Sequence, residues 1–302
     1  MNAYVHGYDA RENLRLQDQA TTLVDLLHAD TAYPAGSRVL EAGCGVGAQT
    51  VTLAHNSPGA RITCVDISAP SVAAARRAVE SAGFGNVTFG QADIFDLPFP
   101  PESFDHAFVC FVLEHLRQPA DALRALKRVL KTGGSITVIE GDHGSAYFHP
   151  DSAHARRAID CQVQLQARSG GNALIGRELY PLLRQAGFDD VHVSPRMVYA
   201  DDSRPALVEG FTRRTFTAMI EEVRAAAIES GLADAPAFDC GIADLYRTAE
   251  PDGVFCYTFF KAVATKPQPS QSTSSGETPK SAWHTGDAEP MRERWSAGAA
   301  DR

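Results

Sequence analysis

The 302-residue sequence lacks basic clusters, long apolar runs and internal repeats. Its formal net charge is −9, and it has no stripe of Lys and Arg that would bind a polyanion such as DNA or RNA. No apolar stretch approaches the length that crosses a bilayer, and residues 1–18 lack a hydrophobic signal core. These absences predict a cytoplasmic protein that binds no nucleic acid and has no membrane span.

Cysteine pairs and metal-binding motifs are also missing. The sequence has 6 cysteines but no C-x-x-C, which argues against a disulfide framework or a zinc ribbon and favours buried free thiols. Several histidines and acids follow residue 141 with neither H-E-x-x-H nor EF-hand spacing, so no metal site is predicted. They are Asp142, His143, His149, Asp151 and His154.

A glycine-rich segment follows the first apolar run. The run ends in Glu41, glycines then stand at alternate positions, and a helical pattern extends from Ala48 to His55. Glycines there let a strand turn sharply into a helix and let a ligand lie against bare backbone. Dinucleotide enzymes share this geometry, and Gly43-x-Gly45-x-x-Ala48 satisfies their fingerprint. Taken alone, the segment predicts a nucleoside-containing ligand.

Three acids at the ends of strand-like runs narrow the choice of ligand. Glu41, just before the glycines, would repel a pyrophosphate but suits a ligand with a cationic ammonium or sulfonium. Asp66 lies about twenty residues beyond the glycines, the offset at which a carboxylate accepts hydrogen bonds from ribose hydroxyls in either ligand type. Asp93 follows a third strand at residues 86–89 and is suited to accept a proton from an exocyclic adenine amine.

Together these motifs resemble the class I S-adenosylmethionine-dependent methyltransferases. The resemblance rests on E-x-G-x-G-x-G, V-D-I-S, A-D-I-F-D-L-P-F, S-F-D-H-A-F-V-C-F-V-L-E-H-L and L-K-T-G-G-S-I-T-V-I-E, in this order. It is densest over residues 36–140, and residues 187–193 and 256–265 are similar to the last two strands of that family. The pattern is closest in type to small-molecule enzymes near the ubiquinone/menaquinone biosynthesis group.

The resemblance implies a cofactor, S-adenosylmethionine, with S-adenosylhomocysteine as its product. Glu41 would hold the methionine ammonium indirectly, Asp66 the ribose and Asp93 the adenine amine, while Ile67 would pack on adenine and Phe111 would line the methionine side. Tyr8 is predicted to close over the sulfonium, unless the N-terminal helix simply packs on the sheet. The full predicted cofactor set is Tyr8, Glu41, Gly43, Gly45, Asp66, Ile67, Ala92, Asp93, Ile94 and Phe111.

Strand-like runs that alternate with helical patterns at residues 69–82 and 119–130 predict the fold class. It is a Rossmann-like α/β fold with a mostly parallel seven-stranded sheet, helices on both faces and an antiparallel last strand. A fourth strand is expected at residues 107–112, a sixth at 187–197 and a seventh at Val254–Thr265. Residues 140–149 are expected to follow the fifth strand.

The chain is predicted to have three parts. Residues 1–35 are expected to form an N-terminal helical lid, and residues 36–265 the methyltransferase domain. Residues 201–250, between strands six and seven, show helical spacing and are predicted to cap the substrate pocket, with an oligomer contact as the alternative. Residues 266–302 are rich in Pro, Ser, Thr, Gln and Gly and are predicted to be a disordered tail.

His143 is the candidate catalytic base, because an imidazole titrates near neutral pH and this strand end faces the transferred methyl group in the resembling family. A histidine that bonds the backbone or closes the cap is the alternative. Nucleic-acid and glutamine-methylating relatives carry (N/D)-P-P-(Y/F) after strand four, whereas this chain has Cys110-Phe111-Val112-Leu113.

The predicted function is methyl transfer to a small, hydrophobic or aromatic metabolite. Apolar side chains in the expected cap favour such an acceptor over a sugar: Phe148, Phe211, Phe216, Met219 and Tyr246. Two rival functions remain open, an NAD-type dehydrogenase on a similar sheet and a non-catalytic protein that binds S-adenosylmethionine. The oligomeric state is also open, with a homodimer among the possibilities.

Overall fold

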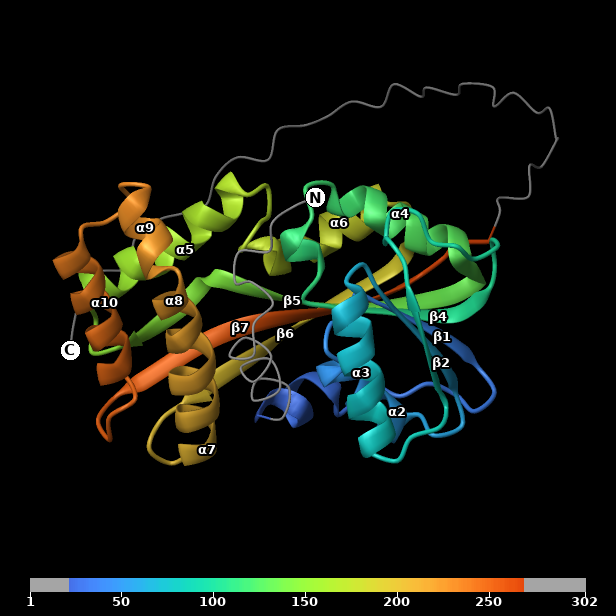
Figure 1. The fold of residues 1–302 in the computed structure, drawn as a ribbon, viewed down its shortest axis with the longest axis horizontal. Helices are drawn as coiled ribbons and strands as arrows, with labels where there is room; N and C mark the ends of the chain where they lie inside the picture. The colour runs from blue at the N-terminus through green and yellow to red at the C-terminus, as the bar shows by residue number, and fades with distance from the viewer. Residues whose placement is uncertain (1–21, 269–302) are drawn as a thin grey trace, which may run out of the picture. The chain divides into compact units, whose positions relative to one another are not determined.

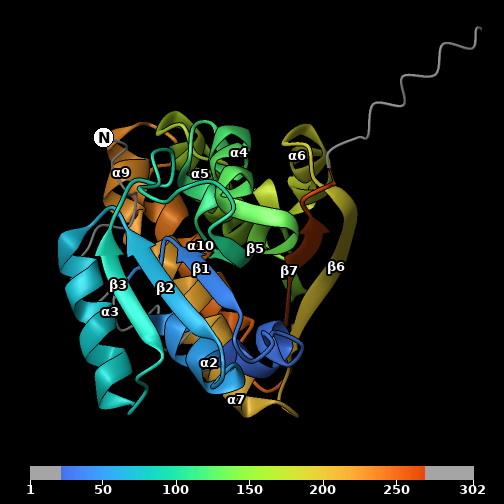
Figure 2. The same ribbon diagram turned by 90° about the vertical axis from the view of Figure 1, so that its right-hand side faces the viewer.

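The computed structural model describes residues 22–268, in which seven strands form one sheet. The strand order is β3-β2-β1-β4-β5-β7-β6 (Figure 2). The strands are β1 (Arg38–Ala42), β2 (Arg61–Asp66), β3 (Val87–Gln91), β4 (Phe104–Cys110), β5 (Leu130–His149), β6 (Asp189–Ala200) and β7 (Val254–Thr265). Strands β1 to β5 pair in parallel, and β7 runs antiparallel to both β5 and β6. The predicted fold class is confirmed.

The sheet is apolar on both faces because helices cover both of them. Val39, Phe108 and Ile139 belong to one buried cluster, whereas their sequence neighbours Leu40 and Val109 belong to the other. Successive side chains of a strand point to opposite faces, so a strand that is buried on both sides reads as a continuous apolar run. This explains why the strands are visible in the sequence as unbroken apolar segments.

The helices that follow the first strands begin where the sequence predicts. Ser68 caps α3, since its side chain accepts a hydrogen bond from the Ser71 backbone amide at 3.3 Å. The helices are α2 (Ala48–Asn56), α3 (Ala69–Ser81), α4 (Pro119–Val129), α5 (Ala153–Arg168), α6 (Leu179–Gln185), α7 (Pro205–Leu207), α8 (Ala218–Glu222), α9 (Arg224–Glu229) and α10 (Ala235–Arg247). Two 3₁₀ turns, η1 (Leu113–His115) and η2 (Ile175–Glu178), and a π-helical segment, η3 (Val208–Thr217), complete the set (Figure 1).

Several strand boundaries differ from the prediction, and two of them bear on the site. Strand β4 ends at Cys110 rather than at residue 112, because Phe111 adopts a left-handed backbone with φ of 57° and leaves the sheet. Strand β5 continues to His149, so residues 140–149 lie within the strand and the expectation that they follow it is wrong. His143 is therefore a strand residue. The reason is β7, which pairs with β5 as far as His149.

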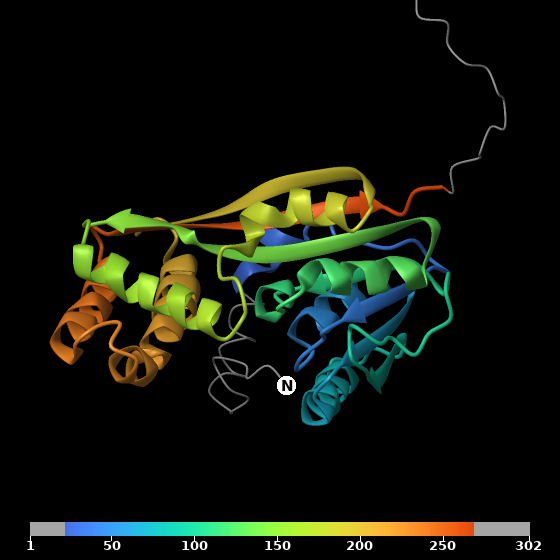
Figure 3. The ribbon, with the colours of Figure 1, turned by 90° about the horizontal axis from the view of Figure 1, so that it is seen from above.

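Strands β5, β7 and β6 extend beyond the rest of the sheet, and helices gather along this extension (Figures 1 and 3). Helices α7 to α10 and η3 lie between β6 and β7 in the chain, within the predicted helical insertion. Helix α5 joins them from an earlier part of the chain, which the sequence did not predict. It packs against α10, where the Ser152 hydroxyl donates to Asp244 at 2.5 Å. The helical part is thus built from two separate segments.

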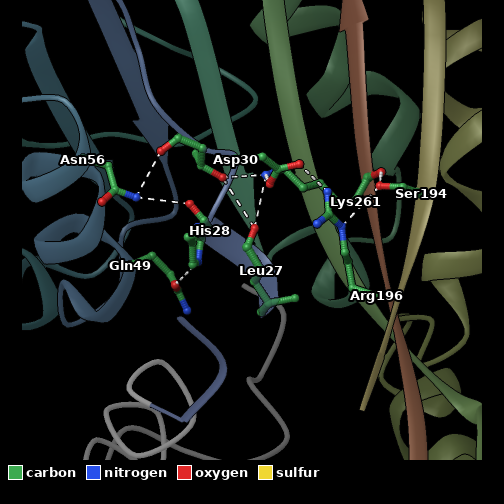
Figure 4. A network of polar contacts seen from close by, with 9 residues as sticks. Leu27, His28, Asp30, Gln49, Asn56, Ser194, Arg196 and Lys261 are labelled. Carbon is green, nitrogen blue, oxygen red and sulfur yellow. Dashed lines mark hydrogen bonds and ion pairs between the residues drawn. The ribbon is translucent and has the colours of Figure 1, made fainter. Parts of the chain in front are cut away.

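The segment before β1 is tied to the sheet by a network of polar contacts (Figure 4). Residues 22–28 are helical, and the buried Lys261 of β7 donates to the Leu27 carbonyl at 3.1 Å and to Asp30 at 2.5 Å. Arg196 of β6 also pairs with Asp30. On the other side, His28 hydrogen-bonds Gln49 of α2 at 2.7 Å. Residues 22–31 therefore connect strands β6 and β7 to helix α2.

Some predictions fall outside the described residues. Tyr8, most of the predicted lid and most of the predicted tail belong to residues 1–21 and 269–302. Within residues 22–268, no helix combines the length and apolar content needed to cross a membrane.

Candidate functional site

The glycine segment connects β1 to α2 at the carboxyl edge of the sheet. Gly43, Gly45 and Gly47 all have positive φ angles, of 77°, 50° and 84°. A Cβ on Gly43 would lie 2.4 Å from the Val112 side chain, and one on Gly47 would lie 2.8 Å from the Ala75 backbone. A Cβ on Gly45 would meet no atom within 4 Å. The first and third glycines thus allow close packing, whereas Gly45 leaves bare backbone open to a ligand.

Asp66 ends β2 and holds this open backbone in place. Its Oδ2 accepts a hydrogen bond from the Gly45 amide at 2.8 Å, and its Oδ1 accepts one from the Ser68 amide at 2.9 Å. An ionised carboxylate has about four lone-pair sites, so each oxygen keeps capacity for a further donor. Asp66 can therefore orient the loop and bind ligand hydroxyls at the same time. The sequence indicated only the second role.

Glu41 lies beneath the loop, with its carboxylate inside the protein. Oε2 accepts hydrogen bonds from the Thr50 hydroxyl at 2.7 Å and the Cys64 thiol at 3.1 Å. Burial raises the pKa of Glu41 to about 7, although both hydrogen bonds lower it, and nearby Asp66 raises it further. Any influence of Glu41 on a cation is thus exerted through the loop, in line with the indirect role expected from the resemblance.

The loop after β3 lies next to Asp66. The Ala92 amide donates to the Asp66 carbonyl at 3.0 Å, and Asp93 Oδ1 accepts from the Phe95 amide at 2.9 Å. Ala92 and Ile94 pack partly against the core, whereas Asp93 is exposed. Ile67 is 55% exposed, which is high for an aliphatic side chain beside such a loop. An apolar surface next to a free acceptor suits a flat heterocycle that carries an amine.

Phe111 links the carboxyl edge to the extended strands. Its amide donates to the Ile139 carbonyl at 2.9 Å, and its partly buried ring lies 5.5 Å from the Phe259 ring of β7. Phe259 in turn contacts Tyr257 and Phe211, at 4.8 and 5.7 Å between ring centres. An aromatic cluster therefore begins at the predicted cofactor residue Phe111 and continues under the helical part.

His143 belongs to this cluster. It is buried, its Nδ1 lies 3.0 Å from the Tyr257 hydroxyl, and its ring centre is 6.0 Å from that of Phe216. Its backbone amide donates to the Ala173 carbonyl at 2.9 Å. Next to it, the buried carboxylate of Asp142 forms two hydrogen bonds of 2.7 Å with Arg177. His143 is thus held on the face of β5 that the helices cover.

Four of the five apolar residues expected in the cap are core residues, namely Phe148, Phe211, Phe216 and Met219. Phe211 is 1% exposed and Phe216 2% exposed, and both pack against Tyr257 and Phe255. Their burial has a physical reason, since the helices rest on the extended strands through these rings. The helical spacing in the sequence marked the buried face of the segment and gave no information on which side chains reach a ligand.

The cysteines were expected to be buried free thiols. All six cysteines are free thiols, and five of them are buried as expected, whereas Cys240 on α10 is exposed. In the described part of the chain, no three His, Cys, Asp or Glu side chains gather in an arrangement that could hold a metal ion.

Comparison with known proteins agrees with this geometry. Residues 40–138, from β1 to β5, match the methyltransferase domain family. The ubiquinone/menaquinone biosynthesis C-methyltransferase of Pseudomonas fluorescens is 38% identical over 128 residues, which cover 42% of this chain and 48% of that enzyme. Residues 40–138 are thus similar to the domain of class I S-adenosylmethionine-dependent methyltransferases. Enzymes of ubiquinone and menaquinone biosynthesis are among the relatives that the chain resembles.

Solved structures that share the fold differ in their chemistry. Phosphoethanolamine N-methyltransferase 2 of Haemonchus contortus, bound to S-adenosylhomocysteine, has a TM-score of 0.51 at 18% identity, covering 83% of this chain and 53% of that chain. The [4+2]-cyclase SpnF has a TM-score of 0.51 at 22% identity, covering 83% and 81%. The chain covers only 35%, 54% and 48% of three curated relatives that it matches. The solved structures therefore show the fold alone, and the acceptor has to be argued from this chain's own residues.

Sequence reasoning missed a set of buried polar residues around the turn after β4. Glu140 of β5 accepts hydrogen bonds from the Val112 and Leu113 amides. The buried Gln166 of α5 donates to both the backbone and the side chain of Glu114, at 3.1 Å each. The only signal in the sequence was a charged or amide residue inside an otherwise apolar strand or helix face. A buried polar group of this kind needs a partner, and here the partner is the turn.

Proposed function

We propose that this chain binds S-adenosylmethionine at the carboxyl edge of the sheet and transfers its methyl group to a small hydrophobic or aromatic acceptor. The observation that carries the proposal is the open backbone at Gly45, fixed by Asp66 and bordered by Ile67. A side chain at Gly45 would fill this cradle, whereas the other two glycines have packing reasons of their own.

The residues at this edge fit the chemical parts of the cofactor. Asp66 would accept hydrogen bonds from the ribose hydroxyls, Ile67 would pack on adenine and Asp93 would accept from its amine. Phe111 would border the methionine part. The similarity of residues 40–138 to methyltransferase domains supports these assignments, and the chain's own hydrogen bonds at Asp66 and Asp93 leave acceptor capacity for them.

When bound, S-adenosylmethionine supplies a methyl group on a positively charged sulfur, so the donor is already activated. The main task of the protein is then alignment, which is worth about 7–11 kcal/mol in well-oriented reactions. The fixed turns after β1, β2 and β4 are suited to this task, since backbone hydrogen bonds hold each of them. A base is required only if the acceptor is protonated or weak.

His143 is our candidate for that base. Its Nδ1 lies at the Tyr257 hydroxyl, so proton transfer would use Nε2. This requires the tautomer in which Nδ1–H donates to Tyr257, and the phenol oxygen would then stabilise the imidazolium that forms. Tyr257→Phe should therefore shift the pH profile of turnover, whereas a purely structural His143 would leave the profile unchanged.

The aromatic side chains beside the carboxyl edge support a hydrophobic or aromatic acceptor. The partly buried ring of Phe111 contacts the buried ring of Phe259, which leads through Tyr257 to His143. A flat apolar acceptor would pack on the Phe111 ring with favourable aromatic geometry. The name of the Pseudomonas fluorescens relative, a quinone biosynthesis enzyme, is in line with this class. The acidic net charge also argues against a polyanionic acceptor.

A mass-spectrometric screen tests the proposal. The protein is incubated with S-adenosylmethionine that carries a deuterated methyl group and with fractions of a metabolite extract. We expect apolar fractions to yield a product heavier by the labelled methyl group, and His143→Ala to reduce its rate. Tight S-adenosylhomocysteine binding with no labelled product in any fraction would favour the non-catalytic alternative. NAD binding without S-adenosylhomocysteine binding would favour a dehydrogenase.

A further inference from the structure

Glu140 is a fully buried acid on β5. It follows Ile139, which pairs with the last residue of β4, so it stands just past the carboxyl edge of that strand. Its Oε1 accepts hydrogen bonds from the Val112 amide at 3.0 Å and from the Leu113 amide at 2.7 Å. These amides begin the 3₁₀ turn η1 and have no partner within it, so the carboxyl group acts as their cap.

The turn that Glu140 holds is strained and packs closely against the glycine segment. Phe111 has a φ of 57°, a conformation that bulky residues adopt only when their surroundings impose it. The Val112 side chain lies where a Cβ of Gly43 would stand, at 2.4 Å from that position. The backbone hydrogen bond at Val112 therefore sets the distance between the turn after β4 and the turn after β1.

The electrostatic surroundings show which property of Glu140 matters. Burial raises the pKa of Glu140 well above its usual range, the nearby Glu114 carboxylate raises it further, and the backbone amides oppose the shift. Within residues 22–268, Oε2 has no hydrogen-bond partner. A neutral carboxyl group still offers a carbonyl-type oxygen to the two amides. The side-chain amide of a glutamine offers the same acceptor.

We propose that Glu140 is a positioning residue that clamps the turn after β4 against the glycine segment and so sets the width of the cofactor site. The inference rests on the proposed function, because it assumes that the cofactor lies between Gly45 and Phe111. Glu140 would act on the cofactor only through the backbone of Val112 and Leu113.

The test is calorimetric titration of S-adenosylhomocysteine into the full chain and two variants. Glu140→Ala removes the acceptor and should lower the affinity by about tenfold or more, because two buried amides lose their partner. Glu140→Gln keeps the acceptor and should bind within about threefold of the wild type, even if its unpaired amide lowers the melting temperature. Hydrogen–deuterium exchange in peptides that cover residues 108–116 should speed up in the alanine variant only.

Two further variants keep the test decisive if Glu140→Ala does not fold. Val112→Ala leaves the hydrogen bonds intact but removes the methyl groups that meet Gly43, and should also weaken binding. Leu183→Ala in α6 removes a fully buried side chain far along the chain from both turns, and should lower the melting temperature without loss of affinity.

The outcomes separate this inference from the proposed function. Absence of S-adenosylhomocysteine binding by the wild type would contradict the proposed function itself. Wild-type binding together with unchanged affinity in folded Glu140→Ala or in Val112→Ala would overturn the positioning role. Glutamine and alanine variants that are equally weak would also overturn it, because the acceptor oxygen would then not be the property that counts.

Discussion

Apolar side chains have opposite roles in two regions of the molecule. These are the carboxyl edge around β1 to β4 and the helical extension around β5 to β7. At the edge, short turns are held by backbone hydrogen bonds to Asp66 and Glu140, and Ile67 is left exposed. In the extension, Phe211 and Phe216 are buried against the strands and carry the packing. An apolar residue at the edge is therefore free to bind a ligand, whereas one in the extension stabilises the fold.

The largest expected effect is on stability, in the extension. Phe216→Ala removes a ring that lies 4.8 Å from the Phe255 ring and should lower the free energy of unfolding by about 3–5 kcal/mol, measured by urea denaturation. The matched change at the edge, Ile67→Ala, should alter it by only about 0.5 kcal/mol while weakening S-adenosylhomocysteine binding. A Phe216→Ala variant of normal stability and lost turnover would instead make Phe216 a pocket residue.

The second prediction concerns the pH dependence of stability. It depends on His28, in the segment of residues 22–31. Burial lowers the pKa of His28 to about 4, against the hydrogen bond with Gln49, which raises it. The folded state holds the ring neutral, so its stabilisation is complete above pH 6.5 and is lost as the pH falls toward 4. The free energy of unfolding should drop by about 3 kcal/mol over this range from His28 alone.

Urea titrations at several pH values measure this drop. His28→Gln should flatten the dependence between pH 6.5 and 4, whereas His55→Gln, at an exposed position in α2, should leave it as in the wild type. An equal slope in all three proteins would show that His28 is not held neutral in the fold.

A third prediction concerns Asp66 at the edge. Asp66→Ala should weaken S-adenosylhomocysteine binding by about 1–3 kcal/mol, because the Gly45 amide and the ribose hydroxyls lose their acceptor. Asp105→Ala is the control. Asp105 also accepts a backbone amide hydrogen bond, from Arg38 at 2.9 Å, but it lies at the opposite edge of the sheet. Equal affinities in the two variants would remove Asp66 from the cofactor site.

The smallest expected effect is the loss of stability when a helix N-cap is removed, and it can be compared at two caps. Ser152→Ala in the extension and Ser68→Ala at the edge each remove an N-cap, and each should cost about 1 kcal/mol of stability. Only Ser68→Ala should also reduce S-adenosylhomocysteine affinity, because Ser68 belongs to the turn that Asp66 holds. Calorimetry on both variants decides this, and equal affinity losses would argue against separate roles for the two regions.

The same contrast explains what the sequence was able to predict. At the edge, Asp66 and Asp93 each lie at or after a strand end within a local motif, so both could be placed from spacing, whereas Phe111 was placed by the resemblance. The packing role of Gly43 depends on Val112, which is about seventy residues away in the chain. No local pattern carries that information.

In the extension, the helical insertion between β6 and β7 was predictable from its period, but its partners were not. The continuation of β5 to His149 depends on pairing with β7, more than a hundred residues later. The addition of α5 depends on its contact with α10. Both features are long-range contacts, which local secondary-structure propensity does not determine. The sequence therefore placed His143 in a loop, although it lies in a strand.

One measurement tests the central claim most directly: calorimetric titration of S-adenosylhomocysteine into the wild type, Gly45→Val and Gly83→Val. Gly83 is the matched control, since it has a φ of 82° with open space around it. It lies just past the C-terminal end of α3, away from the glycine segment. Both valines strain the backbone at a positive φ, but only the one at Gly45 enters the proposed cradle. We predict binding by the wild type and Gly83→Val, and its loss in folded Gly45→Val. Normal affinity in Gly45→Val would contradict the placement of the cofactor at this edge.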